Sequence, residues 1–141
     1  MQTRTDSSRV DLALTVLRVV AGIVFAAHGA QKIFVYGFAG VAGSFGQMGV
    51  PMAGIVGPAV ALIEFFGGLA LVAGLFTRLA SFGLAAVMLG AMSLVHLANG
   101  FFSPDGVEFS LTLFAAATAL AIAGAGRFSL DHMLAARRAT R

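Results

Sequence analysis

Six ionisable side chains lie within or at the edges of long apolar segments of this 141-residue chain: Arg18, His28, Lys32, Glu64, His96 and Glu108. A charged side chain at membrane depth costs roughly 3 kcal/mol on insertion scales, so such groups must neutralise one another or perform chemistry. Histidine and carboxylate groups can pass protons near neutral pH, and lysine and histidine can donate hydrogen bonds to quinone carbonyls. The residue types therefore indicate proton handling and the binding of an apolar, carbonyl-bearing ring.

The composition is that of an integral membrane protein. Hydrophobic residues make up 59% and charged residues 11% of the chain, against roughly 25% charged in a typical soluble domain. The absence of cysteine excludes disulfides, dithiol redox chemistry, thiolate zinc sites and thiolate-bound iron–sulfur clusters in this chain. The net charge of +3 comes from basic residues beside the apolar segments, which favours a membrane topology signal over nucleic-acid binding.

Four apolar segments predict membrane spans at about 12–36, 52–76, 79–99 and 107–126, because about 20 apolar residues cross the hydrocarbon core. Between the first two, Phe38, Val41, Phe45 and Met48 recur on one helical stripe, which indicates a short helix lying on the membrane surface. Glycine and alanine throughout the spans allow close helix packing. We expect a single all-α domain over 1–141, a membrane four-helix bundle with a short interfacial helix between spans one and two.

The basic residues predict the orientation of the bundle. They cluster at the start of span one, in the turn after span two and in the tail 127–141: Arg4, Arg9, Arg18, Arg78, Arg127, Arg137, Arg138 and Arg141. By the positive-inside rule both termini should be cytoplasmic, in the plasma membrane. The first apolar run superficially resembles a signal peptide, but it continues through His28 and Lys32, so we expect it to be retained as a span.

The predicted topology places each ionisable group at a particular depth in the membrane. Arg18 and Lys32 share one face of span one, and His28 lies about 40° from Lys32 at about 100° per residue. His28, Lys32, His96 and Glu108 should share the outer half of the bundle, with Glu64 below them and Arg18 lower still. We assign proton handling to Glu64, His28 and Glu108, ligand binding to Lys32 and His96, and to Arg18 the task of keeping Glu64 ionised.

Plainer explanations exist for most of these residues. Arg18 and Lys32 could extend to the membrane surface, His96 and Glu108 could be solvated, and His28 could be a hydrogen-bonded core residue. Glu64 is different, because a mid-span carboxylate cannot reach water and needs a partner or a function.

The same residue types indicate which cofactors the chain is able to bind. The two histidines and two glutamates are suitable metal ligands but have no compact spacing, so no metal site is predicted. The residue types give little support to a haem between His28 and His96, allow a quinone, and leave the identity of the cofactor open.

A series of short motifs runs along nearly the full length of the chain: Leu17-Arg18, Gly22, His28-Gly29-Ala30-Gln31-Lys32, Gly49-Val50-Pro51, Glu64 with Gly67-Gly68, Gly74-Leu75-Phe76-Thr77-Arg78, His96, Asn99-Gly100-Phe101-Phe102, Gly106-Val107-Glu108 and Gly126-Arg127-Phe128-Ser129-Leu130-Asp131. In this order the motifs resemble those of the DoxX family of small membrane proteins. The resemblance is what the following expectations rest on. It implies a four-span bundle and an association with redox metabolism, since family names refer to quinol oxidase or thiosulfate:quinone oxidoreductase subunits, to catechol or hydroquinone resistance and to membrane oxidoreductase complexes.

Three functional hypotheses remain from the sequence. The leading one is an accessory or small catalytic subunit of a membrane redox system that handles quinone-type molecules and protons. A small-molecule or proton-coupled transporter is an alternative, and it implies a homo-oligomer because four spans are few. The third is a membrane anchor for a soluble oxidoreductase partner, docked through the basic tail. None of the three involves nucleic acid.

Overall fold

The computed structural model describes residues 2–139, with side chains from Ser7 onward, so that Arg141 and the side chain of Arg4 lie outside it. Every regular element in this range is a helix, which confirms the all-α prediction. In chain order the elements are α1 (Gln2–Ala30), the π-helix η1 (Gln31–Tyr36), α2 (Gly37–Gln47), α3 (Ala53–Ala73), α4 (Thr77–Ala91), the π-helix η2 (Met92–His96), the 3₁₀ turn η3 (Leu97–Asn99), α5 (Glu108–Ala123) and α6 (Leu130–Ala139).

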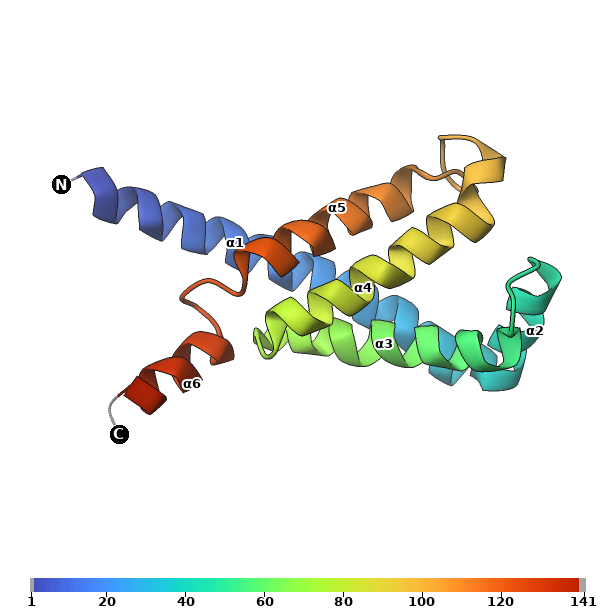
Figure 1. Cartoon of the computed structure of the whole chain (residues 1–141), viewed down its shortest axis with the longest axis horizontal. Coiled ribbons are helices and arrows are strands. Elements are labelled where there is room, and N and C mark those ends of the chain that lie inside the picture. Colours follow the sequence, from blue (N-terminus) through green and yellow to red (C-terminus); the bar gives the residue numbers. More distant parts are fainter. Residues whose placement is uncertain (1, 140–141) are drawn as a thin grey trace.

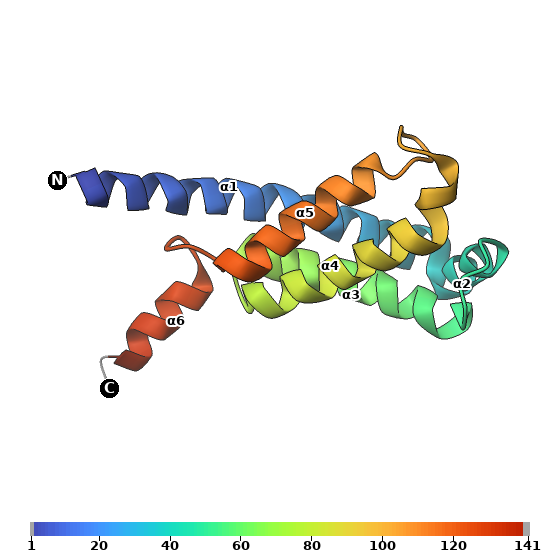
Figure 2. The ribbon, with the colours of Figure 1, turned by 45° about the horizontal axis from the view of Figure 1, so that its top comes forward.

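Helices α1, α3, α4 and α5 form a bundle, and the molecule has two distinct ends (Figures 1 and 2). Both described termini lie toward one end, which also holds the α3–α4 turn (74–76), the linker 124–129 and α6; we call it the terminal end. Helix α2 and the loop 100–107 lie at the opposite end, which we call the loop end.

Within the described residues, three helical stretches are long and apolar enough to cross a bilayer: Ser7–Gln47, Ala53–Ala73 and Thr77–Asn99. The fourth predicted segment is also helical, but α5 has only 16 residues and is about 24 Å long, against about 30 Å of hydrocarbon. A complete crossing by α5 therefore stays a prediction.

The predicted short helix between the first two spans is α2. Gly37 ends η1 with φ of +67°, and the chain turns there into α2. Val41 of α2 is buried, and its Cγ1 would lie 3.2 Å from a Cβ atom at Gly57 of α3. Helix α2 thus packs directly on the start of α3.

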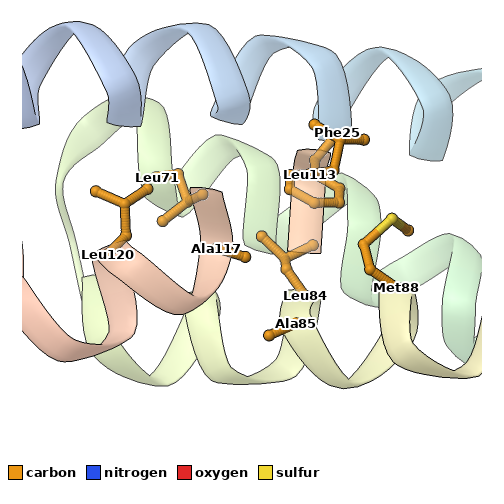
Figure 3. Packing of buried hydrophobic residues seen from close by; sticks show 8 residues of the cluster. All are labelled: Phe25, Leu71, Leu84, Ala85, Met88, Leu113, Ala117 and Leu120. Carbon is orange, nitrogen blue, oxygen red and sulfur yellow. The ribbon is translucent and has the colours of Figure 1, made fainter. Parts of the chain in front are cut away.

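A single apolar cluster joins the four bundle helices (Figure 3). It consists of Phe25 from α1, Leu71 from α3, three residues from α4 and three from α5: Leu84, Ala85, Met88, Leu113, Ala117 and Leu120. Dispersion contacts of this kind hold helices together in lipid, where little hydrophobic force remains between them.

Glycines bring α1 and α3 closest together. A Cβ atom at Gly22 would lie 2.8 Å from the carbonyl oxygen of Gly68, and one at Gly29 would overlap the backbone of Phe65. No larger side chain fits at these positions without moving a helix. This close crossing sets which polar residues of α1, η1 and α3 can meet.

Candidate functional site: a buried lysine–glutamate pair

The centre of the candidate site is an ion pair between η1 and α3. Lys32 Nζ lies 2.5 Å from Glu64 Oε2, and the two side chains are 19% and 5% exposed. A carboxylate buried this deeply in an apolar helix needs a partner, and Lys32 supplies it. The sequence predicts that opposite charges neutralise one another within the bundle, and Lys32 is the cation that neutralises Glu64.

Local backbone structure explains why the two residues meet. Gly29 packs against the backbone of Phe65, the residue next to Glu64, and Lys32 follows Gly29 by one helical turn. From Gln31 the chain continues as a π-helix, which has a wider turn than an α-helix and often occurs at functional sites. Sequence periodicity assumes 3.6 residues per turn, so it gave no sign of this change.

Arg18 does not hold Glu64 ionised, so that prediction is wrong. Its guanidinium donates hydrogen bonds to the carbonyl oxygens of Leu71 (2.5 Å), Val72 (2.7 Å) and Phe128 (2.8 Å), and the side chain is buried. Arg18 and Lys32 are 14 residues apart, which is about 20 Å along the helix. Arg18 therefore binds carbonyl oxygens in the last turn of α3, where the helix dipole also favours a cation.

His28 lies on the α5 side of α1 rather than in the ion pair. Its side chain is exposed, and its ring centroid is 5.7 Å from that of Phe109 at an interplanar angle of 50°. Within residues 7–139 no hydrogen bond joins His28 to Lys32 or Glu64. The structure thus places His28 one turn from Lys32 and beside the start of α5.

His96 and Glu108 both bind the loop 100–107. The ring nitrogen Nδ1 of His96 is 2.9 Å from the carbonyl oxygen of Asp105, and Oε1 of Glu108 accepts a 2.7 Å hydrogen bond from the backbone N–H of Ser103. These contacts hold the loop over the ends of η2 and α5. Like Lys32, His96 belongs to a π-helical segment. The predicted outer-half constellation is therefore divided into the Lys32–Glu64 pair and a loop cluster of His96 and Glu108.

Asp131 has a structural role that its position in the sequence did not predict. Its two carboxylate oxygens accept hydrogen bonds from the backbone N–H groups of Phe76 (2.8 Å) and Thr77 (2.9 Å), so it caps the N-terminus of α4. Its own N–H donates to the carbonyl oxygen of Gly74, and Ser129 Oγ accepts a hydrogen bond from the N–H of His132 at the start of α6. The motif Ser129-Leu130-Asp131 was visible in the sequence, but Thr77, whose N–H Asp131 binds, lies more than 50 residues earlier in the chain.

The chemistry available at the pair follows from its geometry. Lys32 is partly exposed and can donate to a ligand carbonyl, while Glu64 can accept a proton from the same ammonium group. Within the described residues no three His, Asp or Glu side chains are close enough to form a metal-ligand set. An open cleft of about 620 Å³ lies at the terminal end, away from the pair, and is lined by the α3–α4 turn and the linker 124–129.

Comparisons with known proteins agree with the membrane architecture. The DoxX family model matches residues 13–97. The chain is 36% identical over 126 residues to the "Inner membrane protein YqjF" of Escherichia coli, covering 88% of this chain and 93% of that protein. It is 31% identical over 121 residues to the "Putative oxidoreductase CatD" of Bacillus subtilis, covering 86% of each. No solved structure shows significant similarity to it. The chain therefore belongs to the DoxX family of membrane proteins.

Proposed function

We propose that the protein is a membrane-embedded component of a redox system that binds quinone-type molecules at the Lys32–Glu64 pair. The observation that carries this proposal is the burial of a complete ion pair between two apolar helices. Such a pair is expensive to desolvate and contributes little net stability compared with apolar residues of the same size. The function that we assign to this buried ion pair is proton handling combined with hydrogen bonding to a ligand.

The roles of the residues follow from their positions. Lys32, at 19% exposed, donates a hydrogen bond to a quinone carbonyl and gives a proton to its oxygen when the quinone is reduced. The Glu64 carboxylate then takes up a proton that enters from water by way of His28 and passes it to the Lys32 amine, which restores the ion pair. His28, which is exposed and one turn before Lys32, exchanges protons with water at the loop end. Electrons come from the redox partner and are carried by the quinone.

Two further observations support this proposal. Phe34 and Phe65 pack edge to face, with ring centroids 5.8 Å apart, next to the paired residues in sequence. They offer an aromatic surface for a quinone ring. The relative in Bacillus subtilis carries an oxidoreductase name, which is consistent with redox chemistry in the family.

Lipid extraction of the purified protein tests the proposal. Quinone should co-purify with the natural chain and should be lost from K32M/E64M, in which both charges are removed together so that neither is left unpaired. A matched control is S44A/Q47M, which changes two exposed polar residues of α2 at the same end. Equal quinone content in all three preparations contradicts the proposal.

The same variants separate redox chemistry from transport. In proteoliposomes with an imposed pH gradient, proton-coupled uptake of a small molecule that depends on Glu64 would favour the transporter alternative. The redox proposal predicts no uptake and no difference between the natural chain and K32M/E64M in this assay.

A further inference from the structure

The cleft at the terminal end has features of a ligand site that the proposed function does not use. It encloses about 620 Å³ between the start of α4, the linker 124–129, the first residues of α6 and Asp11 of α1. Its lining includes cationic, anionic and apolar side chains, principally Asp11, Phe76, Arg78, Leu79, Arg127 and Asp131.

The two carboxylates of the cleft are occupied by backbone groups. Asp11 Oδ1 accepts a 3.0 Å hydrogen bond from the N–H of Arg127, and Asp131 caps the first N–H groups of α4. The buried Arg18 guanidinium, which binds the carbonyl of Phe128 in the linker, adds a positive charge close to Asp131. Both carboxylates thus accept hydrogen bonds from backbone N–H groups, and within the described residues neither forms an ion pair with an arginine side chain of the cleft.

The arginine side chains of the cleft remain available. Arg78 and Arg127 are exposed, and within residues 7–139 neither guanidinium has a hydrogen bond or an ion pair. Nε of Arg78 would lie 3.3 Å from a Cβ atom at Gly124, so the missing side chain lets Arg78 lie along the linker. His132, also exposed, lines the same cleft.

An exposed apolar surface adjoins these cations. Phe76 and Leu79, which line the cleft, are 67% and 72% exposed, and Phe82 on the next turn of α4 is 70% exposed. Because α4 is the start of a stretch able to span the membrane, this surface continues from the cleft toward the bilayer interior. A ligand suited to both parts has an anionic head and apolar chains.

We propose that the cleft binds the phosphate headgroup of an anionic phospholipid. The guanidinium groups of Arg78 and Arg127 form paired hydrogen bonds with the phosphate, and the acyl chains lie along Leu79 and Phe82. Basic pockets between membrane helices on the cytoplasmic side recognise anionic lipid heads in this way. An anionic phospholipid held there would connect α4, the linker and α6.

Native mass spectrometry of the full chain tests this site. The protein is released from neutral detergent in an equal mixture of phosphatidylglycerol and phosphatidylcholine, and retained lipids are counted. We expect retention of phosphatidylglycerol over phosphatidylcholine, reduced about tenfold in R78Q/R127Q. The control R9Q/R138Q removes the same charge from exposed residues at the terminal end outside the cleft and should keep the preference.

Three results would overturn the proposal. One is an unchanged preference in R78Q/R127Q, and another is an equal loss in R9Q/R138Q, which would indicate a general surface charge effect. The third is a thermal stabilisation by inorganic phosphate equal to that by short-chain phosphatidylglycerol, which would assign the cleft to a free anion. If R78Q/R127Q does not fold, R78Q is compared with R138Q in the same way, since R78Q removes no hydrogen bond within the described residues.

Discussion

Lys32 and Glu64 form an ion pair beside the closest approach of α1 and α3. The pair is held by glycine packing one turn away, at Gly29 against Phe65, rather than by neighbouring polar groups. Breaking the pair and removing it are therefore different experiments, and they should give different results.

Removing only the carboxylate should destabilise the protein. In E64Q the Lys32 ammonium is left without its partner, and breaking a buried pair costs about 3–5 kcal/mol. K32M/E64M should recover most of this loss, because apolar residues of similar size replace the pair without an unpaired charge. Unfolding free energies from denaturant titration in micelles measure both. Equal stability of E64Q and the natural chain would show that the pair is not formed.

The close crossing of α1 and α3 should not tolerate a methyl group. In G29A the new Cβ overlaps the backbone of Phe65, and the forced separation should cost about 1–3 kcal/mol. G90A is the matched control, since nothing lies within 4 Å of a Cβ atom there and alanine is the better helix former. Thermal midpoints should fall for G29A and stay level or rise for G90A. The reverse order would contradict the packing described.

Much of the fold follows from the sequence because lipid imposes simple rules. Apolar segment length predicted a first span to residue 36, where η1 ends, and the spaced apolar residues predicted α2. The partner of Arg18 could not be predicted, because it is a set of backbone carbonyls at the end of another helix. Backbone acceptors carry no side-chain signature, so charge balance alone suggested Glu64 instead.

The separation of the loop cluster of His96 and Glu108 from the Lys32–Glu64 pair could not be predicted from the sequence, for a different reason. Depth along each span placed His96 and Glu108 near Lys32, but depth does not say which way a side chain points. Both turn to the loop 100–107 and bind its backbone. The π-helical turns at Lys32 and His96 also change side-chain direction in a manner that regular periodicity does not describe.

Arg18 should hold the terminal end together without affecting the ion pair. R18M loses hydrogen bonds to carbonyls of α3 and of the linker, which together are worth at least about 3 kcal/mol. Hydrogen exchange should accelerate in 124–131 and at the end of α3, and not around Glu64. The exposed R9M on the same helix is the control. Faster exchange around Glu64 in R18M would instead support a direct link between the two residues.

Asp131 should stabilise the start of α4. D131A removes both carboxylate hydrogen bonds to Phe76 and Thr77, and the lost cap should cost about 1–2 kcal/mol. D105A is a suitable comparison, because the exposed Asp105 side chain makes no hydrogen bond within the described residues. Unfolding free energies should separate the two variants. Equal values would mean that the cap is not formed in the membrane protein.

Quenching of Tyr36 by a short-chain quinone tests the proposed site most directly. Tyr36 is the one tyrosine of a chain without tryptophan, and it lies in η1 four residues after Lys32. In lipid nanodiscs the natural chain should show saturable quenching, whereas K32M/E64M should show only the linear quenching of random collisions. Saturation at the same quinone concentration in both proteins would contradict binding at the Lys32–Glu64 pair.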